Sequence, residues 1–342
     1  MPHPVTEEKP TCTDEVTDFI HQQPRKHSQV YPTIEHWQLR DLVLCPDTRG
    51  ELYLGHRNSV LKYNTSTKKI QNVIQGLTFN PASINIGRGY LAAGGQRGEL
   101  VVQNLTTHQN RQISTGTKIN NALHISHHAG EDRILVCNND STIKALSLPS
   151  LQEAGSLSLP VAVNHCSVSP DGRMLVTVGD SNMVYLYDIR ASHYSRVATM
   201  KGSEDAGFST AWNAQSQQFA VASQDGIVNV WDVRSTSKLA VLGSSQYGQR
   251  NPGACRNVKF SSALGTDLLV FSEHLNNVTL VDARHYNDRQ TIHAIPPGQN
   301  GHIGGTCFSP CGTRLYIGTE KAILEYGVDV LARRRQSFGA LL

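Results

Sequence analysis

The strongest constraint on the fold is a short motif that recurs along the chain at nearly constant spacing. In its clearest copy, "VNVWDVRST" at residues 228–236, an alternating apolar run ends in Trp231-Asp232 and an arginine follows two residues later. The steps between successive copies are 40, 43, 41, 44, 50 and 45 residues. A period of about 40–45 residues is typical of a propeller, in which each repeat forms one four-stranded blade. The copies are anchored at Asn64, Asn104, Ser147, Asp188, Asp232, Asp282 and Gly327.

The internal order of one repeat supports this architecture. The segments "STAWNAQS", "QFAVASQDG", "IVNVWDVRS" and "KLAVLGS" follow one another as four short apolar runs separated by turn residues. Such a unit cannot bury both of its faces alone, whereas stacking seven units in a ring buries them all. The sequence therefore predicts an all-β fold, a seven-bladed β-propeller. Its predicted blades are residues 40–76, 77–116, 117–159, 160–202, 203–249, 250–295 and 296–332.

The seventh repeat lacks a fourth strand. The segment "SQVYPTIEHWQ", residues 28–38, has the composition of a strand and lies at the other end of the chain. We expect it to complete the last blade, so that an N-terminal strand closes the ring and removes its open edge.

Several motifs resemble the WD40-repeat family. Tyr187-Asp188 and Trp231-Asp232 match its strand end, and Ser223 and Asp225 match part of its buried hydrogen-bond set. The resemblance is closer still to fungal and plant WD-repeat proteins with no assigned biochemical role. It is carried by "YPTIEHWQLRDL", "NVKFSSALGTDLLVFSEHLNNVTLVDARHY" and "CFSPCGTRLYIGTEKAILEY". The resemblance implies a propeller fold, and it implies no activity.

Bulk properties limit the partners. A formal net charge of +3 is weak for 342 residues and gives no warrant for nucleic-acid binding, and no stretch has the apolar length of a membrane span. The start "MPHPVTEEKP" lacks the order of a secretory signal, and the seven cysteines are scattered. We therefore expect a cytoplasmic or nuclear protein with free thiols, monomeric outside its complex, that binds neither nucleic acid nor membrane.

No catalytic motif is apparent, so the sequence predicts a protein that is not an enzyme and needs no cofactor. The histidine-rich segment "HISHHAGED", residues 124–132, could in principle hold a metal. Its position at a predicted hairpin favours solvated turn residues, and we expect no metal site. Cys307 and Cys311 lack a second pair, which favours a core thiol and a loop residue.

The two ends of the chain are predicted to lie outside the ring. Residues 1–27 read as a polar, largely flexible tail in which Val16, Phe19 and Ile20 have the spacing of a short helix that could dock on the ring or on a partner. Residues 333–342 read as a basic tail, in which three arginines before Ser337 suit a basophilic kinase.

Two functions remain open. The first is a non-catalytic scaffold that binds a peptide or partner protein, acidic or phosphorylated, on the rim formed by the turns between second and third strands and by the starts of the inner strands. The predicted rim residues are His56, Arg57, Gln96, Arg97, Asn164, Phe208, Gln224, Arg256 and His274.

The second is a substrate receptor of a cullin-4-type ubiquitin ligase. Arg190, Arg234 and Arg284 each stand two residues after a strand-ending aspartate in three consecutive repeats. This pattern resembles the box with which such receptors face their adaptor.

Overall fold

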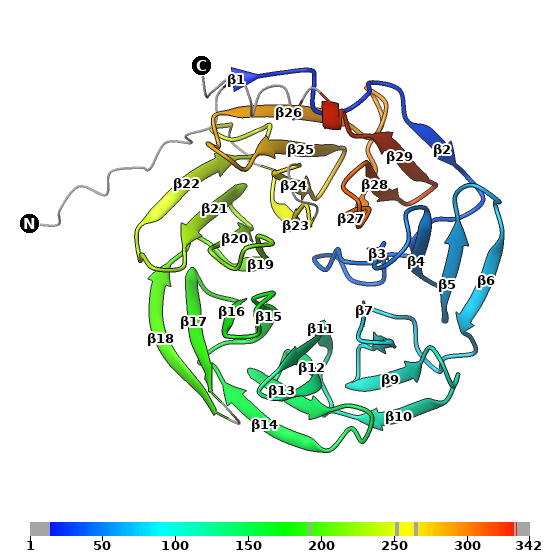
Figure 1. Ribbon diagram of the computed structural model, residues 1–342, viewed down its shortest axis with the longest axis vertical. Helices are drawn as coiled ribbons and strands as arrows, with labels where there is room; N and C mark the ends of the chain where they lie inside the picture. Colours follow the sequence, from blue (N-terminus) through cyan, green and yellow to red (C-terminus); the bar gives the residue numbers. More distant parts are fainter. Residues whose placement is uncertain (1–13, 191–192, 250–252, 263–265, 332, 334–342) are drawn as a thin grey trace, which may run out of the picture.

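The computed structural model describes residues 14–190, 193–249, 253–262, 266–331 and 333. It is a ring of seven β-sheets arranged like blades around a central axis (Figure 1). The predicted seven-bladed propeller is therefore confirmed. Within the described residues, no helix has the length and apolar character needed to cross a membrane.

Each blade contains four antiparallel strands, and their order in the sheet leads from the ring axis to the outer edge. Blade one holds β3 (Val43–Leu44), β4 (Glu51–His56), β5 (Ser59–Asn64) and β6 (Ile70–Ile74). Blade two holds β7 (Ser83–Gly87), β8 (Tyr90–Gly94), β9 (Glu99–Asn104) and β10 (Asn110–Ser114). Blade three holds β11 (Asn120–His128), β12 (Glu131–Asn138), β13 (Thr142–Ser147) and β14 (Glu153–Ser158). Blade four holds β15 (Val163–Val168), β16 (Met174–Gly179), β17 (Met183–Arg190) and β18 (His193–Lys201).

The later blades repeat this order. Blade five holds β19 (Gly207–Trp212), β20 (Gln218–Ser223), β21 (Ile227–Asp232) and β22 (Lys238–Gly243). Blade six holds β23 (Cys255–Phe260), β24 (Leu268–Glu273), β25 (Asn277–Asp282) and β26 (Asp288–His293). Blade seven holds β27 (Ile303–Phe308), β28 (Arg314–Thr319) and β29 (Ile323–Gly327), with a fourth strand from the N-terminal part of the chain.

The core lies between neighbouring blades, as the repeat requires. Trp231 in β21 is fully buried and stacks on Phe219 of β20, with 5.3 Å between ring centroids. Both pack against Val178 and Leu186 of blade four. The Asp232 carboxylate accepts a 2.9 Å hydrogen bond from the Arg234 backbone N–H and holds the following turn. The Trp231-Asp232 pair thus serves the architecture.

An N-terminal strand closes the ring, but it is not the predicted one. The closing strand is β2 (Arg25–His27), which pairs antiparallel with β29. The fully buried His27 fixes this register, because its Nε2 lies 3.0 Å from Glu325 and its Nδ1 lies 2.9 Å from the Tyr63 hydroxyl. Residues 28–38 form no strand; they lead towards the centre of the ring, where the blue chain before β3 is seen in Figure 1.

The segment before β2 is packed on the ring, so the predicted flexible tail and helix are wrong for residues 14–27. A two-residue strand, β1 (Asp14–Glu15), pairs in parallel with β26. Phe19 and Ile20 are buried in the cluster between blades six and seven. Their backbone N–H groups donate to the Gln290 side-chain oxygen at 3.1 and 3.2 Å, which replaces helical hydrogen bonds. Residues 1–13 lie outside the described residues.

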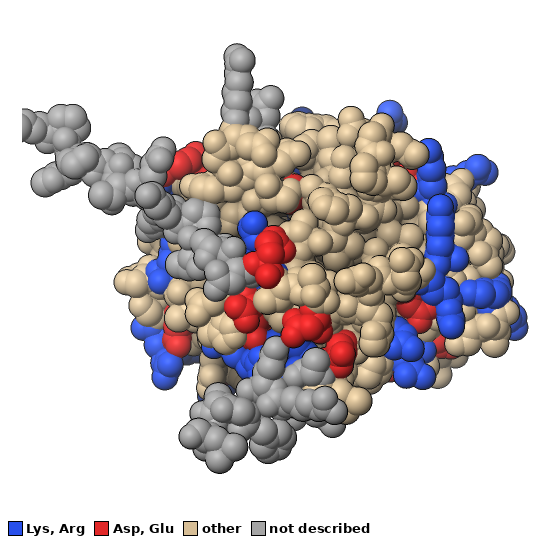
Figure 2. Space-filling view, turned by 90° about the horizontal axis from the view of Figure 1, so that it is seen from above, with Lys and Arg blue, Asp and Glu red and all other residues tan. Residues whose placement is uncertain are grey.

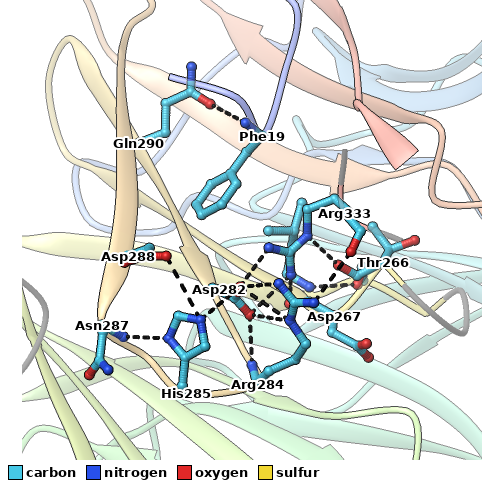
Figure 3. A network of polar contacts seen from close by, with 12 residues as sticks. Phe19, Thr266, Asp267, Asp282, Arg284, His285, Asn287, Asp288, Gln290 and Arg333 are labelled. Atoms are coloured by element: carbon cyan, nitrogen blue, oxygen red, sulfur yellow. Dashed lines mark hydrogen bonds and ion pairs between the residues drawn. The ribbon is translucent and has the colours of Figure 1, made fainter. Parts of the chain in front are cut away.

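The predicted basic C-terminal tail does not begin at Arg333, because this arginine is buried. Its guanidinium donates to both oxygens of Asp282, at 2.6 and 3.0 Å, and lies 5.0 Å from the Phe19 ring centroid (Figure 3). Further hydrogen bonds reach the carbonyls of Thr266 and Asp267. Both ends of the described chain therefore meet on blade six. Residues 334–342, including Ser337, lie outside the described part.

The outer wall carries both signs of charge. Figure 2 views the ring edge-on, with Lys and Arg more frequent towards the right and Asp and Glu nearer the centre. Neither sign covers this side of the molecule.

Candidate partner-binding rim

The inner strands of five blades share one irregularity at the mouth of the central channel. In β11, β15, β19, β23 and β27 the pairing register shifts around the second residue of the strand. A β-bulge of this kind re-aims a side chain and is frequent beside functional sites. Four of these bulged residues line one small cavity at the channel mouth, with a volume of about 20 Å³. The five bulged residues are Asn121, Asn164, Phe208, Arg256 and Gly304.

Residues 31–42 run across this mouth. The segment is anchored by the hydrogen bonds Thr33 N–H to Gly55 O (2.9 Å) and Leu42 N–H to Gly304 O (3.0 Å). The glycine is required in blade seven, because a Cβ at Gly304 would lie 2.6 Å from Cγ of Pro32. The absence of a side chain at Gly304 therefore leaves room for the backbone of residues 31–42.

Arg40 shapes the end of this segment. Its Nη1 donates to the carbonyls of His36 and Leu39, and its Nη2 donates to the carbonyl of Trp37 at 2.9 Å. The side chain is buried, so these carbonyls replace water as its hydrogen-bond partners. The resulting turn presents Trp37 to solvent with 67% of its surface exposed. An exposed tryptophan held by a buried arginine is an unusual feature that folding alone does not require.

Arg256 lies beside this tryptophan. Its guanidinium carbon is 4.4 Å from the centroid of the Phe208 ring and 5.8 Å from that of Trp37, both within cation–π range. The residue is only 4% exposed. Its Nε and Nη1 have no hydrogen-bond partner within the described part of the chain.

The site is electropositive at neutral pH. Burial, followed by the charge of Arg40, lowers the pKa of Arg256 to about 10, and burial lowers the pKa of Arg40 to about 10 as well. Both guanidinium groups therefore stay charged. Burial first, and then these two charges, also lower the pKa of His36 and that of His274, so neither histidine gains a proton at neutral pH. Asp205 and Glu320 act on the two arginines in the opposite direction.

The structure places the other predicted rim residues around this mouth in two groups. On blades one and two, residues 31–35 touch the predicted rim directly: the His56 ring lies 3.0 Å from the Tyr31 carbonyl, and the Gln96 amide donates to the Glu35 carbonyl at 3.3 Å. Arg57 and Arg97 are exposed, and no contact joins them. Arg57 has φ of +50° in the β4–β5 turn, so it contributes to the turn as well as to the rim.

On blades four to six, the predicted residues contribute polar atoms. The Asn164 amide donates to Asp180 at 2.8 Å. Gln224 Oε1 and His274 Nδ1 are buried without a hydrogen-bond partner among the residues described. The arrangement thus brings Asn164, Phe208 and Arg256 into one cavity and leaves the remaining predicted residues around it.

The arginines of the predicted adaptor box lie on the opposite face, because their strands run away from the rim. Arg190 and Arg234 have 82% and 80% of their side chains exposed, and each pairs with the aspartate two residues earlier at 2.7 Å. Arg284 differs: it pairs with the fully buried Asp282, beside Arg333 (Figure 3). Of the three arginines in the predicted box, two are therefore exposed at the surface.

The predicted histidine cluster is divided between separate contacts. His127 pairs with Asp132, Glu131 pairs with Arg133, and His124 Nε2 accepts the Val168 N–H inside the channel.

Ligand atoms of another group, Asp282, His285 and Asp288, lie within 4.8 Å of one another. Both oxygens of Asp282 already accept hydrogen bonds from guanidinium groups, which leaves a cation little to bind. Cys307 is a core thiol and Cys311 an exposed turn residue, in line with the sequence.

Below the mouth, the channel holds a second, larger polar cavity of about 210 Å³. Asp41 accepts a 2.6 Å hydrogen bond from Lys259 there and lies 3.8 Å from His165 Nε2. Burial favours a raised pKa for Asp41, but Lys259 and His165 outweigh it and lower this pKa to about 2. The channel interior is therefore lined by an ion pair.

The geometry defines a seven-bladed β-propeller with a polar channel mouth. Residues 155–188 and 194–232 match the family described as "WD domain, G-beta repeat", and residues 253–293 match "Uncharacterised protein domain (DUF2415)". "Uncharacterized protein C4G3.03" of Schizosaccharomyces pombe is 33% identical over 316 residues, covering 87% of this chain and 89% of that protein. The chain therefore belongs to the WD-repeat family that includes this fission-yeast protein, which confirms the resemblance seen in the sequence.

Two further similarities are more limited. "Target of rapamycin complex subunit LST8" of Saccharomyces cerevisiae is 36% identical over 75 residues, which are 22% of this chain and 24% of that protein. A chain in the "Crystal Structure of Mitotic Checkpoint Complex" superimposes with a TM-score of 0.72 at 15% identity, covering 92% of this chain and 97% of that one. The second similarity concerns the fold alone.

Sequence reasoning missed the residues that complete the mouth, namely His36, Trp37 and Arg40. They stand in "EHWQLRD", which was interpreted as part of the closing strand and the residues after it. A signal was present in the sequence. Pro32 cannot donate a backbone hydrogen bond to a neighbouring strand, and Trp37 and Arg40 do not continue an alternation of apolar and polar residues.

Proposed function

We propose that this protein is a non-catalytic scaffold that receives a segment of a partner protein, acidic or phosphorylated, at the channel mouth. WD-repeat propellers generally bind proteins rather than catalyse reactions, and a relative is named as a complex subunit. The observation that carries the proposal is the exposed Trp37 against the buried Arg256. Aromatic and arginine side chains in partly enclosed sites are the usual energetic anchors of protein interfaces. Arg57 and Arg97 would supply exposed charge at the border of such an interface.

A second candidate is adaptor binding on the opposite face, as in a ubiquitin-ligase substrate receptor. The observation that favours it is the pair Arg190 and Arg234, exposed at equivalent positions of neighbouring blades. Each guanidinium is already paired with an aspartate, but exposed pairs of this kind contribute little and are readily exchanged.

One affinity purification with three baits tests both functions. The baits are the tagged wild-type chain, Trp37→Ala at the mouth, and Arg190→Glu with Arg234→Glu on the opposite face. If the mouth is the binding surface, specific partners should be lost with Trp37→Ala and retained with the double variant. The reverse pattern, with adaptor and cullin peptides lost only from the double variant, would favour the ligase function. Equal recovery of all proteins by the wild type and Trp37→Ala would refute the mouth as the binding surface.

A further inference from the structure

We propose that the channel mouth binds one side-chain carboxylate of the partner segment, with Arg256 as its main donor. This inference rests on the proposed function and names the chemical group that is recognised there. It follows from a comparison of the bulged residues, from the unpartnered donors in the cavity and from the shape of the site.

The bulged position has a structural task in some blades. Asn121 Nδ2 donates to the Val163 carbonyl of the next blade at 2.8 Å. Asn164 Nδ2 does the same towards the Gly207 carbonyl at 3.0 Å. Each asparagine thus connects two blades at the channel mouth.

Blades five and six give up this connection. Phe208 has no polar atom to donate, and the Arg256 guanidinium makes no such bond but lies over the Phe208 ring. The exchange replaces two inter-blade hydrogen bonds by one buried charge, which is costly in a closed site. A ligand that accepts hydrogen bonds from the Arg256 guanidinium would offset the unfavourable free energy of burying its charge.

The cavity offers donors in excess. Four side-chain nitrogens that line it have no hydrogen-bond partner in the described parts of the chain: Nε of Arg40, Nε and Nη1 of Arg256, and Nδ2 of Asn257. The one acceptor in the same condition is Oδ1 of Asp41, whose charge is already balanced by Lys259. Unsatisfied buried donors are rare in folded proteins, and this set has the chemistry of an anion site.

The geometry favours a carboxylate over a phosphate. The N–H groups of a guanidinium lie in its own plane, where a planar carboxylate can accept from two of them. The Phe208 and Trp37 ring centroids lie 4.4 and 5.8 Å from the guanidinium carbon of Arg256 and line its surroundings with apolar surface. The cavity is small, and Asp205 and Glu320 act on the two arginines from the rim. A dianionic phosphate would be repelled by both of these acids more strongly than a carboxylate.

The protein carries its own reporter for a test. Of its three tryptophans, Trp212 and Trp231 are buried in blade five, and Trp37 alone is exposed. We would follow Trp37 emission in the full chain while adding three blocked pentapeptides with alanine around a central glutamate, glutamine or phosphoserine. The glutamate peptide should give a saturable change below about 20 mM, because one charged group in a donor-rich site is expected to bind in the millimolar range. The glutamine peptide should bind at least tenfold more weakly.

Variants connect the signal to the site. Arg256→Met should abolish the preference for glutamate without lowering the melting temperature, because it removes an unpartnered buried charge and keeps the side-chain volume. Arg256→Lys keeps the charge but loses the planar donors, so it should weaken binding to an intermediate degree and remains informative if Arg256→Met fails to fold. Arg196→Met, on the exposed outer strand of blade four, is the matched control and should bind as the wild type does.

Four results would overturn the inference. These are equal binding of the glutamate and glutamine peptides, unchanged binding by Arg256→Met, the absence of any saturable signal, or tenfold tighter binding of the phosphoserine peptide. The two proposals can fail separately. A Trp37-dependent partner that Arg256→Met still retains would remove the carboxylate only, whereas a glutamate-selective mouth without any Trp37-dependent protein would remove the scaffold function.

Discussion

Replacing Asp282 by asparagine should cost the protein about 3–5 kcal/mol of unfolding free energy, the usual effect of removing one partner from a buried ion pair. Asp282 is fully buried, and its two oxygens accept hydrogen bonds from Arg284 and from Arg333, the shortest at 2.5 and 2.6 Å (Figure 3). Asparagine keeps the shape but loses the charge and points an NH₂ group at guanidinium donors. Arg333→Met should cost less, roughly 2–3 kcal/mol, because Arg284 still pairs with Asp282.

Urea unfolding, followed by tryptophan emission and circular dichroism, measures both effects, and their pH dependence separates charge from packing. Burial opposes ionisation, but the hydrogen bonds from Arg284 and Arg333 outweigh it and hold the pKa of Asp282 well below its usual range. A depressed pKa means that the carboxylate's contribution is complete above the unfolded value of about 4 and is lost as the pH falls towards the folded value. The advantage of the wild type over Asp282→Asn should therefore be constant between about pH 5 and 7 and shrink below about pH 4. A loss under about 1 kcal/mol at pH 7 would refute the reasoning.

Three further changes test the remaining contacts. Phe19→Ala should lower the unfolding free energy by about 3–5 kcal/mol, because the ring is buried between blades six and seven; a neutral result in thermal melts would mean that residues 14–20 do not dock. Gly304→Val should cost about 1–3 kcal/mol and shift Trp37 emission, because its side chain would collide with Pro32; unchanged emission would contradict the placement of residues 31–42. Arg57→Asn combined with Arg97→Ala should leave the melting temperature unchanged, since asparagine tolerates the positive φ at residue 57, and should weaken a mouth-dependent partner by about 2 kcal/mol in calorimetry. Equal affinity would place these two arginines outside the interface.

The ring could be predicted from the sequence because its cause is local and repeated. Each blade needs alternating apolar residues, tight turns and a polar residue at the end of its third strand. The clearest strand ends are Asp188, Asp232 and Asp282, and their spacing is typical of a propeller. Erosion of the motif in other blades did not hide the period. The strands from β3 to β29 all fall within the predicted repeats, and only β1 and β2 lie before them.

The ends of the chain could not be predicted, because their structure depends on contacts that are distant in sequence. Residues 25–27 are three residues with no alternation of their own, and only the buried partners of His27 make them the closing strand. The spacing of Val16, Phe19 and Ile20 suits a helix in isolation. The carboxamide of Gln290, about 270 residues away, captures the backbone N–H groups that a helix would use. From the sequence, Arg333 is expected to be an exposed member of a basic tail. Its burial follows from the ion pair with Asp282, which is 51 residues away.

The candidate site falls between these two cases. Four of its residues occupy the same position in successive repeats, so the period alone predicts that Asn121, Asn164, Phe208 and Arg256 converge on one mouth. What the period cannot predict is how they differ in role. The two asparagines are explained by the carbonyls they bind on the next blade, whereas Arg256 is not explained by any bond within the described residues. Under the proposed function, this difference between equivalent positions is what would make the mouth specific for one partner.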